Sequence, residues 1–303
     1  MHHISISNEI CSKVAPESQK KRKHIILPWI GNPTTGAQAG DLCFQQRHEA
    51  NTLELFFDLF FVANLATFTA YHSVTDHAEL LAYIGFFGII WGTWFAITLF
   101  DVRFAVDSVY ERACKLVQMV VFVGFALAGS QFQPGGDITD DNSTNFRVIS
   151  VLLAMSRGLL FIQYTVALIF CIKAKFNKLI FPLALCAVFY LLTTAVFGVM
   201  TIAFRNDNTY SPGIYSIWYI AIFLETVLVL AVSSIWRMLS FKKTHLVERM
   251  ALLTLIVIGE GAIGVTKTVS ALLGKKGPDP AGSAQVFSIV LVSGTITTYE
   301  GYN

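Results

Sequence analysis

The chain of 303 residues carries 22 basic and 20 acidic side chains, for a net charge of +2, and 54% of its residues are hydrophobic. Charged residues make up 14%, against roughly a quarter in soluble domains, and the mean hydropathy is +0.58. This composition excludes a soluble globular domain and indicates a polytopic membrane protein. The small net charge, without a basic patch interleaved with aromatic residues, excludes nucleic acid as an expected partner.

Residues 1–48 are predicted to be a disordered cytoplasmic tail, and residues 49–303 a transmembrane helical bundle. The tail contains a basic run, Lys20 to Lys23, and a linker rich in Gly, Pro and Thr at 31–40. Its first 24 residues are polar, so no cleavable signal is expected and the first span should act as its own signal. A basic run before the first span favours a cytoplasmic amino terminus.

Residues 52–71 form the first predicted span, a mostly apolar stretch of about twenty positions that matches a bilayer core. Two carboxylates, Glu54 and Asp58, lie four positions apart and so share one face of a helix. Glu54 is close enough to the start of the span to lie among headgroups. Asp58 is deeper, and because a charge near the bilayer centre costs about 3 kcal/mol, we expect it to be paired inside the protein.

Apolar segments predict six further spans, at about 80–100, 114–133, 146–172, 179–204, 214–239 and 249–271. A weaker eighth segment begins near Ala284 and runs to Asn303. The sequence therefore predicts an all-α integral membrane bundle with seven spans and a partial eighth.

The basic residues of the loops predict the orientation. A cytoplasmic amino terminus places most loop lysines and arginines on the inner side, as the positive-inside rule requires. The outer side then keeps only Arg147, Arg205, Lys275 and Lys276. The sequon that begins at Asn142 falls in an outer loop, so Asn142 is a predicted glycosylation site.

Three more charged residues, Arg157, Glu225 and Glu260, fall near the middle of predicted spans. Unpaired, they and Asp58 would cost on the order of 10 kcal/mol, so we expect them to form one intramembrane charged cluster with Glu54. The expected pairing sets the guanidinium of Arg157 against Glu260 or Asp58. Such a cluster either fixes the register of the helices or forms a polar pathway or site.

Other patterns carry less weight. Residues 259–264 spell a dinucleotide fingerprint, but they lie inside a predicted span with no strand before them. We interpret His72, Asp76 and His77 as a solvated loop rather than a metal site. Lys267 lies near the outer end of its span, where lysine ordinarily reaches the headgroups, which argues against a bound chromophore. The five cysteines lack zinc spacing, and we expect no metal and no cofactor.

Three segments match one protein family in their sequence and in their order along the chain. They read TLELFFDLFFVANLATFT (52–69), DVRFAVDSVYERACKLVQM (101–119) and HLVERMALLTLIVIGEG (245–261). Together they resemble the low temperature requirement A protein family, and their sequence is most similar to that of its fungal members. The resemblance implies a membrane protein and specifies no reaction. It places the following residues in family motifs: Arg103, Asp107, Arg112, His245, Glu248 and Arg249.

The family resemblance also implies a difference in length. Members usually continue for several more spans, so we expect either a shortened member or a shortened gene model. Without the resemblance, Glu248 and Arg249 fit the capping and anchoring of a helix start, and Asp107 fits a surface pair with Glu111 or Arg103.

The leading functional interpretation is a transporter- or channel-like protein that moves a proton, an ion or a small solute, with Asp58 and Glu260 as exchange sites and Arg157 as their counter-charge. The alternative is an intramembrane enzyme, cyclase- or isomerase-like, that acts on a lipophilic substrate through one carboxyl group as general acid. A non-catalytic membrane component is the third. The expected partners are the lipid bilayer and a proton, an ion or a small lipophilic solute.

Overall fold

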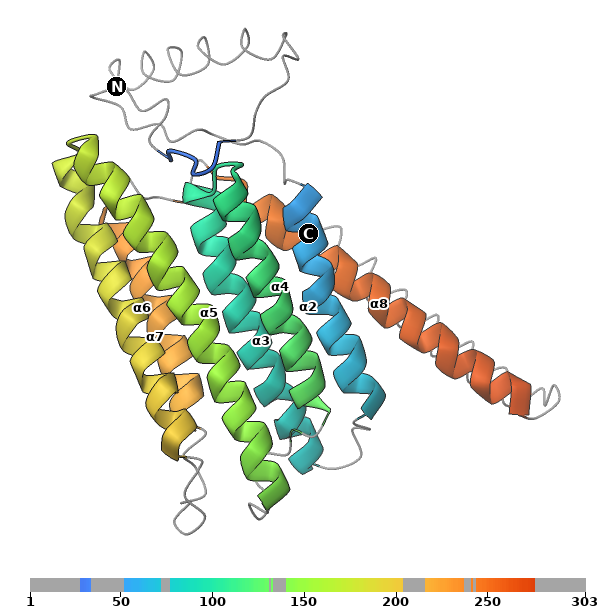
Figure 1. Ribbon diagram of the computed structural model, residues 1–303. Helices are drawn as coiled ribbons and strands as arrows, with labels where there is room; N and C mark the ends of the chain where they lie inside the picture. The colour runs from blue at the N-terminus through green and yellow to red at the C-terminus, as the bar shows by residue number, and fades with distance from the viewer. Residues whose placement is uncertain are drawn as a thin grey trace, which may run out of the picture. The chain divides into compact units, whose positions relative to one another are not determined.

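The computed structural model describes residues 28–33, 52–71, 77–130, 132, 140–203, 216–236, 241 and 244–275. This part of the chain contains seven α-helices and no strand, which confirms the all-helical class (Figure 1). The helices are α2 (Thr52–Tyr71), α3 (His77–Phe104), α4 (Val109–Gly129), α5 (Asp140–Lys173), α6 (Asn177–Ala203), α7 (Ser216–Ile235) and α8 (Leu246–Lys275).

Six of these helices, α2 to α7, are long and apolar enough to cross a membrane. The first predicted span coincides with α2. The seventh span, in the region of α8, stays a prediction, and the eighth lies outside the described residues together with nearly all of the predicted tail.

The turn between α3 and α4 is shorter than the sequence suggested. We expected a loop from about residue 100 to 114, but α3 continues to Phe104 and α4 begins at Val109. Ser108 precedes α4 in an extended conformation, and its hydroxyl accepts a hydrogen bond from the backbone N–H of Glu111. This cap satisfies one of the free N–H groups at the start of α4. With α3 extending to Phe104, residues on both sides of the short turn are helical.

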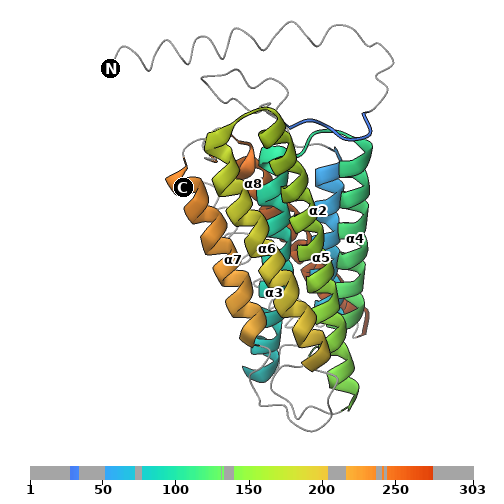
Figure 2. The same ribbon diagram turned by 60° about the vertical axis from the view of Figure 1, so that its left-hand side comes forward.

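The chain divides into two compact units, residues 1–249 and residues 250–303. In the first unit, α3 is the central helix and packs against α2, α4, α5 and α7 (Figures 1 and 2). Around it, α2 packs on α4, α4 on α5, α5 on α6 and α6 on α7. The interior is rich in aromatic rings, and Phe68 of α2 stacks on Phe86 of α3 with ring centroids 4.6 Å apart. Large apolar side chains cover the outer faces, as expected of helices that meet lipid.

Two glycines on one face of α3 allow α7 to approach closely. A Cβ atom at Gly92 would lie 2.3 Å from Cγ2 of Ile222, and one at Gly85 would lie 2.4 Å from the hydroxyl of Tyr219. Gly88, between them, would meet nothing within 4 Å. Small residues at helix contacts are a common means of close packing in membranes, and here they bring α7 against the central helix.

We predict that Gly92→Ala destabilises the protein whereas Gly88→Ala does not. The added methyl group at position 92 collides with buried Ile222, and such overpacking typically costs about 1–3 kcal/mol. The midpoint of thermal unfolding of the purified protein in detergent measures the effect. Ile222→Ala removes the colliding methyl group, so adding Gly92→Ala to that variant should cause little further loss. Equal losses at positions 88 and 92 would contradict the close contact.

Candidate functional site

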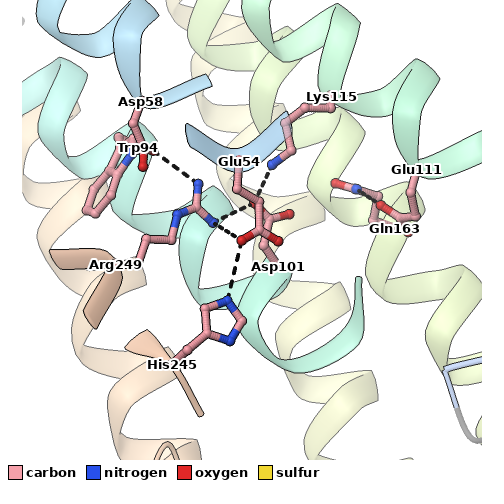
Figure 3. Close-up of polar contacts among 9 residues, drawn as sticks. All are labelled: Glu54, Asp58, Trp94, Asp101, Glu111, Lys115, Gln163, His245 and Arg249. Carbon is pink, nitrogen blue, oxygen red and sulfur yellow. Dashed lines mark hydrogen bonds and ion pairs between the residues drawn. The ribbon is translucent and has the colours of Figure 1, made fainter. Parts of the chain in front are cut away.

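Arg249, in the first turn of α8, lies at the centre of a group of charged side chains (Figure 3). The side chain is fully buried. Its Nη2 donates to Oδ1 of Asp58 on α2 and its Nη1 to Oδ2 of Asp101 on α3, each over 3.1 Å. Oε2 of Glu54 lies 3.9 Å from Nη1. One guanidinium therefore faces three carboxylates.

Three further side chains hold these carboxylates in place. The ammonium group of Lys115, on α4, donates to Oδ2 of Asp101. Nε2 of His245 lies 3.3 Å from Oε2 of Glu54, and the indole N–H of Trp94 donates to Oδ1 of Asp58 over 2.7 Å. We refer to the charged members as the Arg249 cluster: Glu54, Asp58, Asp101, Lys115, His245 and Arg249.

The alternating direction of the helices explains why these residues meet. Glu54 is in the first turn of α2, Asp101 in the last turn of α3 and Lys115 near the start of α4. Because successive helices run in opposite directions, the start of α2, the end of α3 and the start of α4 lie at the same end of the bundle, and after α4 to α7 the chain returns there to begin α8. Asp58 lies one turn, or about 6 Å, further along α2 than Glu54.

The Arg249 cluster combines acids and bases from several helices. Glu54, Asp58 and Asp101 supply three acids, whereas only Arg249 and Lys115 are permanent cations. The sixth member, His245, contacts Glu54 through its imidazole ring.

A second ion pair lies in the middle of the bundle. Nε of Arg157, on α5, donates to Oε2 of Glu225 on α7 over 3.1 Å, and Nη1 donates to the hydroxyl of Thr93 on α3 over 2.9 Å. Both charged side chains are buried, with at most 1% of each exposed. Glu225 is near the midpoint of α7, so this pair lies deeper in the bundle than the Arg249 cluster.

The pairing of the acids differs from the one expected from the sequence. Arg157 binds Glu225 rather than Asp58 or Glu260, and Asp58 binds Arg249 instead. The ion pairs thus place the charges in two groups, because Arg249, assigned above to a helix start, carries its guanidinium into the interior. Glu260 belongs to the second compact unit and is partly exposed, and its place in a cluster stays a prediction.

The family-motif residues lie in three different environments. His245 and Arg249 belong to the Arg249 cluster. Arg103 is buried, and its Nη2 donates to the hydroxyl of Ser233 on α7. The remaining motif residues are at the surface: Arg112 bonds to Asp107 over 2.9 Å, and Glu248 is exposed in the first turn of α8.

The interpretation of Glu248 as a residue that suits the helix start agrees with this placement. The partner of Asp107 is Arg112 rather than the expected Glu111 or Arg103. Asn142 lies in the first turn of α5, and its side chain is outside the described part of the structure.

Sequence reasoning missed Asp101, Lys115 and Trp94. Asp101 fell between two predicted spans and Lys115 at the very start of one, although two signals placed both in helices. Phe100 and Phe104 continue the apolar spacing of α3 past Asp101, and the pattern Ser108-x-x-Glu111 is a capping box that marks the start of α4. Trp94 offered no such signal, since an indole in an apolar span is ordinarily core.

The acids of the cluster are directed at basic side chains rather than at each other. Within the described ranges, no three His, Cys, Asp or Glu residues are grouped in a way that could hold a metal ion.

We predict that the Arg157–Glu225 pair is needed as a pair rather than for either charge alone. Arg157→Met leaves Glu225 buried without its cation, which typically costs about 3–5 kcal/mol, and Glu225→Met has the converse effect. In the double variant two apolar side chains replace the pair, and most of the lost stability should return. Thermal unfolding in detergent measures all three variants.

The exposed pair supplies the matched control for this experiment. Arg112 and Asp107 form an ion pair with side chains 55% and 42% exposed, so Arg112→Met should change stability by less than about 1 kcal/mol. A double variant no more stable than the weaker single variant would contradict the pairing of Arg157 with Glu225.

Comparison with known proteins agrees with the fold and with the three sequence segments. The model of the Bacterial low temperature requirement A protein (LtrA) family matches residues 49–299. No curated protein and no solved structure matches the chain. The matched region is more than half of the chain and includes all six candidate spans and every member of the Arg249 cluster. The chain therefore belongs to the low temperature requirement A protein family and is a multi-pass membrane protein.

Proposed function

We propose that this protein is a proton-coupled transporter or channel in which the Arg249 cluster is the site where protons are exchanged. The observation that carries the proposal is the environment of Asp58. This side chain is fully buried, and its Oδ1 accepts hydrogen bonds from both Arg249 and Trp94. Its Oδ2 is buried and has no hydrogen-bond partner within the described residues. One carboxylate oxygen therefore serves the ion pair, and the other is available to a proton.

A proton on Asp58 would compete with Arg249 for this carboxylate. Arg249 joins α8 to α2 through Asp58 and to α3 through Asp101. Protonation neutralises Asp58 and weakens the first of these bonds, so the helix ends that the guanidinium holds together become free to separate. A transporter needs such an element with two arrangements, whose balance is shifted by the bound ion.

The position of His245 adds a second group that can take part. It contacts Glu54, one turn from Asp58 and nearer the end of the bundle. A proton that enters from that end would meet His245 and Glu54 before Asp58. Deeper in the bundle, Glu225 has one oxygen on Arg157 and its other oxygen, Oε1, buried without a hydrogen-bond partner in the described residues. We include Glu225 as the next acid on the route.

The enzyme alternative receives less support from the same contacts. A general acid must be neutral before it donates its proton, and an apolar pocket achieves this by excluding counter-charges. Each acid of the Arg249 cluster instead lies within 4 Å of a basic side chain, with distances of 3.3 Å for Glu54 and 3.1 Å for Asp58. A proton on one of these acids therefore competes with an ion pair, which suits reversible exchange coupled to a rearrangement better than acid catalysis.

Proton uptake by liposomes that contain the purified full chain tests the proposal. With a pH-sensitive dye inside and a potassium diffusion potential as driving force, the protein should acidify the lumen faster than protein-free liposomes do. Asp58→Asn keeps the shape of the side chain but cannot exchange a proton, and we expect it to reduce uptake to the protein-free rate. Glu225→Gln should slow uptake if the route extends to the middle of the bundle.

Asp107→Asn is the matched control, because it makes the same chemical change at an exposed acid near the same end of the bundle. It should leave uptake unchanged. Each variant must first elute as a single peak from size-exclusion chromatography. Uptake no faster than in protein-free liposomes, or equal rates for the parent and Asp58→Asn, would remove the basis of the proposal.

We also propose that the Arg249 cluster lies at the cytoplasmic end. The loop between α5 and α6 is at the same end of the bundle as the start of α2, and it is bordered by Lys173, Lys175 and Lys178. This concentration of lysines supports a cytoplasmic position, and with it a cytoplasmic amino terminus.

Expression in a eukaryotic host tests this orientation. We expect Asn142, at the opposite end of α5, to be glycosylated, so that glycosidase treatment increases electrophoretic mobility and Asn142→Gln abolishes the difference. A protease added to sealed, right-side-out cells should leave an epitope at the amino terminus intact. An epitope that is cleaved under these conditions would reverse the orientation.

A further inference from the structure

Arg103, in the last turn of α3, is a buried cation with unused hydrogen-bonding capacity. Only 8% of the residue is exposed. Its Nη2 donates to the hydroxyl of Ser233, and its guanidinium carbon lies 3.7 Å from the centre of the Phe241 ring. Its Nε and Nη1 are buried and have no hydrogen-bond partner in the part of the chain that the structure describes. Two N–H donor groups are therefore left for something else.

The charge of Arg103 distinguishes it from the other two buried arginines. Arg157 is paired with Glu225, and Arg249 with Asp58 and Asp101. Among the described residues, Tyr164, Tyr190 and Cys186 are the ionisable groups that act on Arg103, and all three are ordinarily neutral at physiological pH. A buried charge is costly unless it is both paired and hydrogen-bonded, and within the described residues Arg103 has no carboxylate.

The two tyrosines add further donors close to Arg103. Tyr164 of α5 and Tyr190 of α6 are stacked with ring centroids 5.2 Å apart, and only 1% of each is exposed. Both hydroxyl groups are buried without a hydrogen-bond partner in the described structure. α3, α5, α6 and α7 thus bring one unpaired guanidinium and two unpaired phenol groups into the same region. The guanidinium and phenol groups thus leave several buried N–H and O–H donors without a hydrogen-bond partner among the described residues.

We propose that Arg103, Tyr164 and Tyr190 bind an oxyanion, namely a carboxylate or phosphate group, with Ser233 as a supporting contact. Guanidinium groups bind planar carboxylates and tetrahedral phosphates through charge-assisted hydrogen bonds, and phenol hydroxyls also donate hydrogen bonds to their oxygens. The anion would supply the negative charge that Arg103 lacks and acceptors for the unpaired donors. A small soluble molecule and a lipid headgroup both carry such a group.

The sequence on both sides of Phe241 is basic. The segment 236–245, which contains Phe241, includes Arg237, Lys242 and Lys243 and no acid. The proposed site needs no proton exchange at Asp58, so it stands or fails separately from the proposed transport function.

Ligand-dependent thermal unfolding of the purified full chain in maltoside detergent tests the site. Inorganic phosphate and succinate are compared with sodium chloride at equal ionic strength. We expect at least one of the two oxyanions to raise the unfolding midpoint by about 3 °C or more at saturating concentration, because a ligand that binds only the folded state stabilises it. Phosphatidylglycerol added to the micelles tests the lipid source.

Two variants show whether the effect depends on the proposed donors. Arg103→Gln should abolish the stabilisation, whereas Arg112→Gln, which removes an exposed arginine at the same end of the bundle, should preserve it. If Arg103→Gln does not fold, the double variant Tyr164→Phe/Tyr190→Phe decides, since it removes only the two hydroxyl groups. Its apparent affinity should be at least about fivefold lower, as expected when hydrogen bonds to a charged group are lost.

The possible outcomes distinguish a soluble anion, a lipid headgroup and the absence of a specific site. Stabilisation by phosphate or succinate that needs Arg103 identifies a soluble oxyanion, and stabilisation by phosphatidylglycerol alone identifies a headgroup. Equal effects of chloride and of all three oxyanions would overturn the proposal. So would a shift that is unchanged in Arg103→Gln, or in the double tyrosine variant where Arg103→Gln does not fold.

Discussion

A charge buried in an apolar bundle needs an opposite charge beside it, because no water is there to solvate it, and this constraint explains the contacts of Arg249. The guanidinium is fully buried and binds acids that come from α2 and from α3. Asp101 in turn binds Lys115 of α4. Removing Arg249 would leave Asp58 without a cation in a medium that solvates charges poorly. The same contacts that neutralise the charges therefore also fix the positions of these helix ends.

Two neighbouring residues of α3 connect the two charged groups. Trp94 donates to Asp58 in the Arg249 cluster, and Thr93 accepts from Arg157 in the deeper ion pair. Successive residues of a helix point about 100° apart, so one residue faces α2 and the next faces α5 and α7. Because α3 is the central helix, a small rotation of it would alter both groups together. Under the proposed function, this arrangement would carry the effect of a proton at Asp58 to the ion pair in the middle of the bundle.

The sequence was most informative where the cause is local. The apolar stretch 52–71 predicted α2, and the spacing of Glu54 and Asp58 placed both on one face, as the structure has them. The partner of Asp58 was not predictable in the same way. It is 191 positions away along the chain, and its choice depends on how several helices rotate against one another. Mid-span depth correctly singled out Arg157 and Glu225 as buried charges, but it could not show that they pair with each other.

Family motifs share the same limit, because a motif gives the residue type and not its surroundings. Arg103 and Arg112 belong to one segment, yet the first is buried without a carboxylate in the described residues and the second is an exposed partner of Asp107. What the structure adds is the reason that the three segments occur together. The first supplies Glu54 and Asp58, the second supplies Asp101, and the third supplies Arg249. The acids of the first segment bind Arg249 and His245 of the third, and Asp101 of the second binds Arg249 as well as Lys115 of its own segment, so the three segments meet in one cluster.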